Sequence, residues 1–207
     1  MRDTRGAVFF EPERPIFTAQ APGRMDVMGG IADYSGSLVL QMPISEHTTV
    51  RLQPTTDGGL RLYSAQAAEA DLVADFTADW VQVDDEGMSL HEVGQRIRQL
   101  PGGDWAVYVA GCLAVLRRSK GLKVSGMRIW VSSEVPFGKG VSSSAAVEVA
   151  TMKALQQAYD LRFDHTELPR LAQQVENQVG RRRLWPHGPA GQLFWSKRSA
   201  LAHHLPA

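Results

Sequence analysis

The chain has 207 residues, of which 43% are hydrophobic and 21% charged, proportions typical of a soluble globular domain. It carries 22 basic and 22 acidic side chains, and this even balance argues against a bulk electrostatic attraction to nucleic acid or to a membrane surface. The single cysteine, Cys112, cannot form an internal disulfide, and the sequence contains neither an apolar run of membrane-spanning length nor an apolar leader, so we expect a cytoplasmic protein.

The first half of the chain is rich in strand-forming residues. Segments with Val, Leu, Ile and Thr in partial alternation, bounded by Gly and Pro, predict strands. A turn that contains the pair Asp57-Gly58 suits a hairpin, so residues 47–53 are expected to pair with residues 60–64. Together with one strand from the second half, the expected strands cover residues 16–21, 37–53, 60–64, 70–76 and 126–133.

Helices follow in the second half, where apolar residues recur at helical spacing. Asp104 is a good N-cap, so a helix is expected to begin there, with Trp105, Tyr108 and the buried thiol of Cys112 in the core, as is Met127 of the following strand. The expected helices cover residues 89–100, 104–116, 143–159 and 166–179. Since strands come first and helices later, without regular alternation, the predicted fold class is α+β.

A glycine-containing loop between the strand at 126–133 and the helix at 143–159 predicts an anion site. Gly138 and Gly140 lack a Cβ atom and permit close approach of the backbone to a ligand. The helix that follows presents unpaired N–H groups and a positive dipole end, which suit a phosphate. Three consecutive serines offer hydroxyl donors, or oxygen ligands for Mg²⁺: Ser142, Ser143 and Ser144.

The same loop has a simpler interpretation, a structural turn followed by a serine N-cap. It is not a Walker A motif, because no Gly-Lys-Ser/Thr follows at the required spacing. Lys139, inside the loop, is then a solvated surface lysine. Alone, the loop is suggestive only.

A second dense segment, Ala21 to Ile44, places one guanidinium, two carboxylates and a phenol among glycines. Arg24 and Asp33 together suit a polyhydroxyl ligand, because a carboxylate can accept hydrogen bonds from two sugar hydroxyls. The alternative is a polar loop with an exposed Arg–Asp pair, which contributes little energetically.

Taken together, the two segments resemble motifs of the GHMP kinases. The segment that begins at Gly23-Arg24 resembles the galactokinase signature, and its continuation from Asp26 to Ser37 is similar to L-arabinokinases. The loop resembles the family's ATP motif, Pro-x-x-x-Gly-Leu-x-Ser-Ser-Ala, with Val141 at the leucine position. The resemblance implies the α+β fold of a GHMP kinase N-terminal domain (ribosomal protein S5 domain 2-like), with ATP and Mg²⁺ as cofactors.

The resemblance also implies roles for individual residues. Arg24 would lie beside the sugar hydroxyl that attacks the γ-phosphate, as a catalytic residue, and Ser144 and Glu176 would hold Mg²⁺. The sugar would contact Asp33, Tyr34 and Gly30. The residues that would bind the ATP phosphates are Pro136, Gly138, Gly140, Val141, Ser142, Ser143, Ser144 and Ala145.

The sequence departs from the family at two places. Galactokinases have Glu-His where this chain reads Gly30-Ile31, which disfavours galactose and favours L-arabinose. The family's catalytic aspartate, in a Cys-Gly-x-Met-Asp-Gln segment shortly after the helix of Glu176, is absent. Five of the 22 basic residues and none of the 22 acidic ones follow Gly180, so residues 1–179 carry 17 basic and 22 acidic side chains.

This change of composition coincides with the lost motif. Shifting the reading frame by one nucleotide allows the codons from Gly180 onward to spell Gly-Ala-Ala-Cys-Gly-Leu-Met-Asp-Gln-Leu-Ala-Ser, which contains the missing segment. We therefore expect residues 8–179 to form the ATP- and sugar-binding domain and residues 180–207 to be a frameshift product. The C-terminal GHMP domain is then missing, and the chain is expected to be an inactive N-terminal fragment of a sugar 1-kinase.

Two alternatives remain open from the sequence. The first is another substrate, namely galactose, glucuronate or a heptose, because part of the sugar pocket lies in the missing residues. A different class of function is a galactokinase-like regulator that binds ATP and sugar without turnover. The six histidines show no metal-ligand spacing, no nucleic-acid or membrane partner is expected, and the sequence does not reveal the oligomeric state.

Overall fold

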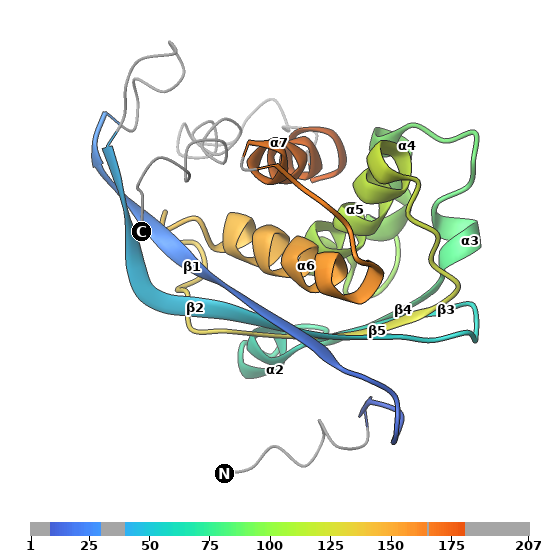
Figure 1. The fold of residues 1–207 in the computed structure, drawn as a ribbon. Coiled ribbons are helices and arrows are strands. Elements are labelled where there is room, and N and C mark those ends of the chain that lie inside the picture. The colour runs from blue at the N-terminus through green and yellow to red at the C-terminus, as the bar shows by residue number, and fades with distance from the viewer. Residues whose placement is uncertain (1–8, 30–39, 165, 181–207) are drawn as a thin grey trace.

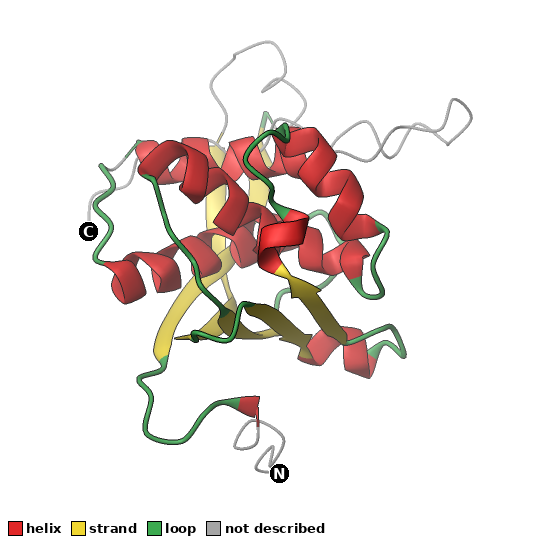
Figure 2. Cartoon of the chain, turned by 90° about the vertical axis from the view of Figure 1, so that its right-hand side faces the viewer, coloured by secondary structure: helices red, strands yellow, loops and turns green. Residues whose placement is uncertain are grey.

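A computed structural model of the chain describes residues 9–29, 40–164 and 166–180 (Figure 1). Five strands form one sheet in the order β1-β2-β5-β3-β4, and the larger helices cover one of its faces while the short α2 lies on the other (Figures 1 and 2). This confirms the expected α+β class. The strands are β1 (Phe17–Met28), β2 (Leu40–Pro54), β3 (Gly59–Ser64), β4 (Asp75–Asp79) and β5 (Met127–Ser133).

The helices agree largely with the expected ones, with two short additions between residues 65 and 83. None of the described helices is long and apolar enough to cross a membrane. The helices are α2 (Ala65–Glu69), α3 (Trp80–Val83), α4 (Leu90–Arg98), α5 (Gly103–Lys120), α6 (Ser143–Tyr159) and α7 (Glu167–Gln174), which continues into a π-helical turn, η2 (Val175–Val179).

The expected hairpin between β2 and β3 is wrong. The turn itself forms, with Gly58 at φ 77°, but β5 lies between the two strands, antiparallel to β2 and parallel to β3. The reason is burial of β5 on both faces. Ile129 is fully buried under the helices, whereas Trp130 packs on the other face against Tyr63, with ring centroids 4.1 Å apart. A strand that is buried on both faces takes a central position, which a local turn signal cannot reveal.

Two boundaries also differ from expectation. The strand expected at 70–76 begins only at Asp75, because α2 and its closing turn occupy the preceding residues. Asp104 is not the N-cap of α5. The cap is Gly102 at φ 76°, and Asp104 lies in the first turn, where its charge complements the helix dipole. Helix α4 begins as predicted, with a capping box between Ser89 and Glu92.

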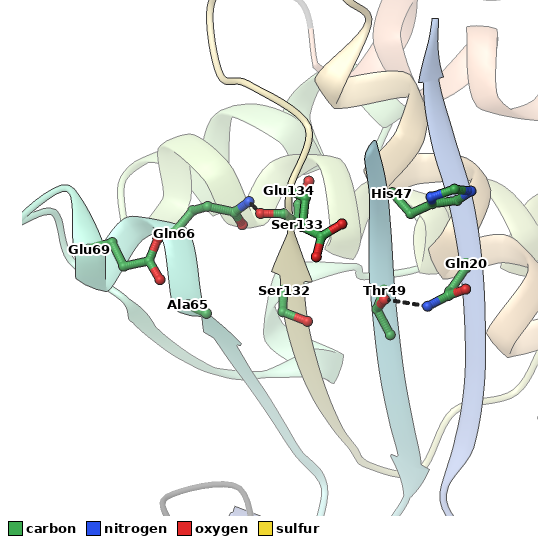
Figure 3. Close-up of a pocket in the computed structure, with 9 residues that line it drawn as sticks. All are labelled: Gln20, His47, Thr49, Ala65, Gln66, Glu69, Ser132, Ser133 and Glu134. Carbon is green, nitrogen blue, oxygen red and sulfur yellow. Dashed lines mark hydrogen bonds between the residues drawn. The ribbon is translucent and has the colours of Figure 1, made fainter. Parts of the chain in front are cut away.

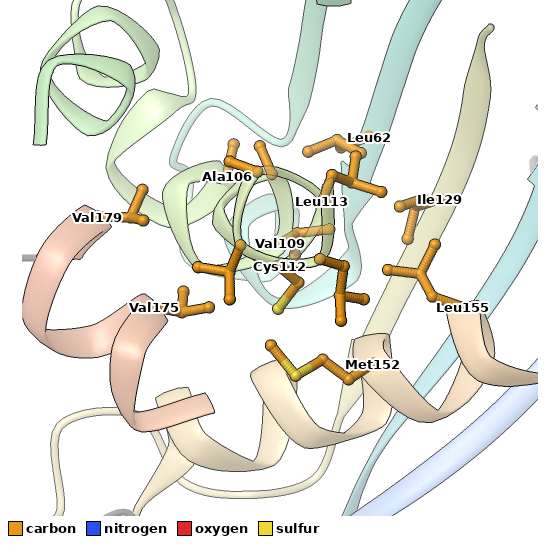
Figure 4. Packing of buried hydrophobic residues seen from close by; sticks show 14 of the residues in the cluster. Leu62, Ala106, Val109, Cys112, Leu113, Ile129, Met152, Leu155, Val175 and Val179 are labelled. Atoms are coloured by element: carbon orange, nitrogen blue, oxygen red, sulfur yellow. The ribbon is translucent and has the colours of Figure 1, made fainter. Parts of the chain in front are cut away.

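Helix α5 is the centre of the hydrophobic core (Figure 4). Its residues Val109, Cys112 and Leu113 are fully buried between the sheet, α6 and η2. The thiol of Cys112 lies 3.6 Å from the carbonyl oxygen of Glu148 in α6, and burial raises the pKa of this thiol. The expected core positions are confirmed for Cys112 and Met127, whereas Trp105 and Tyr108 are only partly buried against the core.

One glycine holds α4 tightly against η2. A Cβ atom on Gly94 would lie 2.2 Å from the carbonyl oxygen of Val179, and the guanidinium of Arg98, one turn later, donates a hydrogen bond to the same oxygen at 3.0 Å. The position of η2 therefore depends on the absence of a side chain at residue 94.

We expect Gly94→Ala to destabilise the chain by about 1–3 kcal/mol, the usual cost of overpacking. A decrease in the free energy of unfolding would be informative, because Gly→Ala in an unobstructed helix increases it by roughly 1 kcal/mol. Gly87→Ala is the control, since a Cβ atom there meets nothing within 4 Å. Urea denaturation of both variants measures the difference, and a Gly94→Ala chain as stable as the parent would contradict the close contact.

Candidate functional site

The glycine-containing loop leaves β5 and opens α6, as the sequence predicts. Gly138 and Gly140 have φ values of 70° and 74°, and Ser142 has φ 59°. These are left-handed conformations, which glycine adopts easily and other residues rarely. The loop therefore needs its two glycines for their backbone conformation, while the space around their ideal Cβ positions is open.

The alternative of a serine N-cap is confirmed in position, but not in the hydrogen bond that a capping serine makes. Ser142 is the N-cap residue of α6, but its side chain makes no capping hydrogen bond, and the first turn contains no acidic residue. Within the described residues, neither a capping side chain nor an acidic side chain of the first turn offsets the unpaired N–H groups and the positive dipole end of α6. Such a helix start binds anions, because its N–H groups and dipole favour negative charge.

The two sequence motifs are in direct contact. The backbone N–H of Arg24 in β1 donates a hydrogen bond to the carbonyl oxygen of Val141 at 3.0 Å. A Cβ atom on Gly23 would lie 3.0 Å from the same oxygen and 2.8 Å from Cγ1 of Val135. Gly23 is therefore the residue that lets β1 approach the loop. The side chain of Arg24 is buried there, with 8% of the residue exposed.

Two glutamates lie behind the serine hydroxyls. Glu148 is fully buried on α6, one turn after Ser144, and Glu176 comes from η2 with 9% of the residue exposed. Burial raises the pKa of Glu148 well above its usual range, the nearby negative charge of Glu176 adds to this, and the charge of Arg24 opposes it. Burial also raises the pKa of Glu176, against the opposing effects of hydrogen bonds from Glu148 and Ser144 and the charge of Arg98.

These pKa directions assign the proton between the two carboxyls. Neither oxygen of an ionised Glu148 has a hydrogen-bond donor in the described residues, and the same holds for Oε2 of Glu176. Two carboxyls can share a hydrogen bond only when one of them is protonated. Burial and the nearby charge of Glu176 raise the pKa of Glu148 well above its usual range, so the neutral form of Glu148 is favoured.

The residues present fit a magnesium ion. Glu176 Oε2 is buried without a donor, and the hydroxyl of Ser144 is hydrogen-bonded to the same carboxylate. Mg²⁺ prefers hard oxygen ligands, takes only one or two of them from the protein and completes its shell with phosphate oxygens and water. Ser144 and Glu176 supply such oxygens at the mouth of the phosphate loop.

A polar pocket lies next to this loop, on the side of the sheet that carries α2 (Figure 3). Its volume is about 310 Å³, and its walls include Ser132, Ser133 and Glu134, the residues that lead into the loop, with Gln66 of α2 opposite. In β1 and β2, Gln20 donates a hydrogen bond to Thr49 Oγ1 at 2.9 Å. The sequence analysis did not identify this pocket.

The structure locates only part of the predicted site. It brings Arg24, the phosphate loop and Glu176 together, whereas Gly30, Asp33 and Tyr34 lie outside the described residues, as does the segment after Gly180. Glu148 was missed in the sequence, although a single acidic residue in a largely apolar helix, four positions after Ser144, was a usable signal.

The protonated state of Glu148 predicts a pH dependence of stability. A carboxyl whose pKa is raised by folding stabilises the folded chain fully below the ordinary glutamate pKa, and this contribution is lost as the pH rises through the folded-state pKa. Glu148→Gln keeps the donor and removes the charge. We therefore expect the variant to be more stable than the parent near neutral pH, because the parent must then either ionise a buried carboxyl or take up a proton on folding.

Below about pH 4 the two chains should have equal stability, because Glu148 is then neutral in both states. Urea denaturation across this pH range measures the effect. Glu86→Gln, at a side chain that is 93% exposed, is the control and should change little. A Glu148→Gln chain that is less stable than the parent near neutral pH would show that Glu148 is ionised and compensated.

Comparison with known proteins agrees with this geometry. The family model described as "GHMP kinases N terminal domain" matches residues 107–187, and the one described as "Galactokinase galactose-binding signature" matches residues 7–54. The chain is 41% identical to an L-arabinokinase of Arabidopsis thaliana over 82% of its own length, and 33% identical to a galactokinase of Streptomyces coelicolor over 76%.

The chain is shorter than these relatives. It spans 19% of the L-arabinokinase and 36% of the galactokinase. Among solved structures it resembles a Lactococcus lactis galactokinase complexed with galactose, with a TM-score of 0.69 and 23% identity over 86% of this chain and 42% of the other. A mevalonate kinase of Methanococcus jannaschii gives a TM-score of 0.60 at 18% identity, over 81% of this chain and 47% of the other.

These likenesses and the contact between the two motifs have one explanation: the chain belongs to the GHMP kinases, as an N-terminal domain of the galactokinase-like kind.

Proposed function

We propose that this chain is the ATP- and sugar-binding part of a cytoplasmic kinase that transfers the γ-phosphate of ATP to the anomeric hydroxyl of L-arabinose or a similar monosaccharide. The observation that carries the proposal is the hydrogen bond from Arg24 N–H to the carbonyl of Val141, which joins the sugar motif to the phosphate loop. The likeness to an L-arabinokinase supports the choice of sugar.

The nucleotide is bound by the loop and the pocket beside it. Backbone N–H groups at the start of α6 would face the phosphates, with Gly138 and Gly140 allowing the close approach. The residues proposed to bind the phosphates are Pro136, Gly138, Gly140, Val141, Ser142, Ser143, Ser144 and Ala145. The nucleoside is proposed to occupy the pocket at Ser132 and Gln66, whose wall includes Glu134 at the entry to the loop. Mg²⁺, held by Ser144 and Glu176, would neutralise charge on the phosphate oxygens.

Phosphoryl transfer requires positioning and charge neutralisation more than covalent chemistry. Arg24 supplies a buried cation between the phosphate loop and the sugar motif, and such a group stabilises charge that develops in the transition state. Asp33, Tyr34 and Gly30 would hold the sugar hydroxyls. A base for the attacking hydroxyl is the missing aspartate, which in our frameshift hypothesis lies in the other reading frame.

The domain is proposed to end at residue 179, with the tail at 180–207 replacing the catalytic segment. The chain as written then binds ATP without transferring phosphate, which is also how a galactokinase-like regulator behaves. Galactose stays as an alternative substrate, supported by the match to the galactose-binding signature over residues 7–54.

The binding test uses the 207-residue chain with ATP in the presence and absence of Mg²⁺. We expect Ser144→Ala to weaken binding of Mg·ATP about tenfold, which corresponds to about 1.4 kcal/mol for one lost ligand. Binding of ATP in EDTA should change much less. Calorimetric titration measures both affinities.

The control is Ser119→Ala, because the hydroxyl of Ser119 donates to the carbonyl of Val115 within α5 at 2.8 Å, away from the loop. If the parent 207-residue chain binds ATP neither with Mg²⁺ nor in EDTA, the proposed function is refuted.

Catalysis is tested separately. The 207-residue chain should show no ATP-dependent phosphorylation of L-arabinose or galactose, because the catalytic base is absent. Restoring the reading frame after codon 179, together with the downstream coding sequence, should produce a sugar 1-phosphate, detected by transfer of radiolabelled γ-phosphate. Turnover by the 207-residue chain contradicts the frameshift hypothesis, and binding without turnover by the restored protein favours the regulator.

A further inference from the structure

Lys139 is a charged side chain of the phosphate loop to which the proposed function gives no role. It lies between Gly138 and Gly140, both at positive φ, in an exposed part of the loop. No ion pair forms between its ammonium and any carboxylate of the described residues, in contrast to Lys120, whose ammonium lies 2.6 Å from Glu167. Within the part of the chain that the structure describes, the loop therefore presents a cation without a counter-charge.

The sequence around Lys139 contains no acidic residue between Val135 and Val147. The flanking acids are Glu134, at the entry to the loop, and Glu148, which is fully buried on α6. A free lysine in this position adds to the positive end of α6 instead of being neutralised by neighbours. Electrostatics thus favour an anion with several charges over one with a single charge.

A second observation points to a ligand at the same place. Ser143 lies in the first turn of α6, directly after the loop, and is 8% exposed. Behind it, Oε2 of Glu176 is buried without a donor. Buried polar atoms normally have partners, and a carboxylate oxygen takes a donor or a cation, so this end of the loop suits a phosphate group that carries a metal ion.

We propose that Lys139 contacts the terminal phosphates of the bound nucleotide, and that it sets the preference of the site for a triphosphate over nucleotides with fewer phosphates. This inference rests on the proposed function, since it presumes a nucleotide at the loop. A lysine suits the task, because its ammonium is a compact charge on a flexible four-carbon stem. Hydrogen bonds between two charged groups are roughly twice as strong as neutral ones.

The experiment measures the affinity of the 207-residue chain for ATP, ADP and adenosine in EDTA, so that Mg²⁺ does not mask the lysine. Lys139→Ala should bind ATP five- to tenfold more weakly, lose less affinity for ADP and keep the parent's affinity for adenosine. Lys139→Arg should retain most of the ATP affinity, because it keeps the charge. Lys123→Ala, which removes a lysine from the segment before β5, is the control.

The salt dependence gives a second readout, which a merely structural lysine would not change. The decrease in ATP affinity with rising salt should be less steep in Lys139→Ala than in the parent chain, because one cation has been removed. Equal ATP affinities for parent and Lys139→Ala would overturn the role of Lys139 while leaving the proposed function intact. Absence of ATP binding by the parent would overturn both.

Discussion

The arrangement of this molecule depends on the hydrogen bond between Arg24 and Val141, and on the glycine that permits it. Arg24 follows the bulge in β1, and Val141 is the last residue before the cap of α6, so the bond ties two segments more than a hundred residues apart in the sequence. Any side chain on Gly23 would collide with Val135 or with the carbonyl itself. The cation of Arg24 and the amino end of α6 thereby share one region of the protein.

From this contact the rest of the site follows by helix geometry. Ser144 and Glu148 are four residues apart on α6 and lie on the same side of it, so Glu148 stands directly behind the serine. Glu148 feels both the positive charge of Arg24 and the negative charge of Glu176, which comes from η2. The arginine opposes the rise in the pKa of Glu148 that burial and Glu176 cause.

Local signals in the sequence were sufficient for the elements nearest to the site. The boundaries of α6 and β5 and the need for two glycines in the loop all follow from residue types at fixed spacing. The order of the strands did not follow, because Asp57-Gly58 specifies a turn and not which strand lies beside β2. The partnership of Glu148 with Glu176 depends on the packing of η2 against α4 and α5, which no spacing in the sequence encodes. Glu176 itself was assigned through the resemblance to the family, and the structure adds what surrounds it.

The π-helical turn at the end of α7 restricts insertions and deletions in the segment that carries Glu176. Its wider winding, closed by the bond from Gly180 N–H to the carbonyl of Val175 at 2.7 Å, accommodates one more residue than an α-helical turn. Each residue of an α-helix advances about 100° around the axis, so deleting one residue between α7 and Glu176 would point the carboxylate away from Ser144. Substitutions on the exposed side of this segment are tolerable, but a change in its length is not.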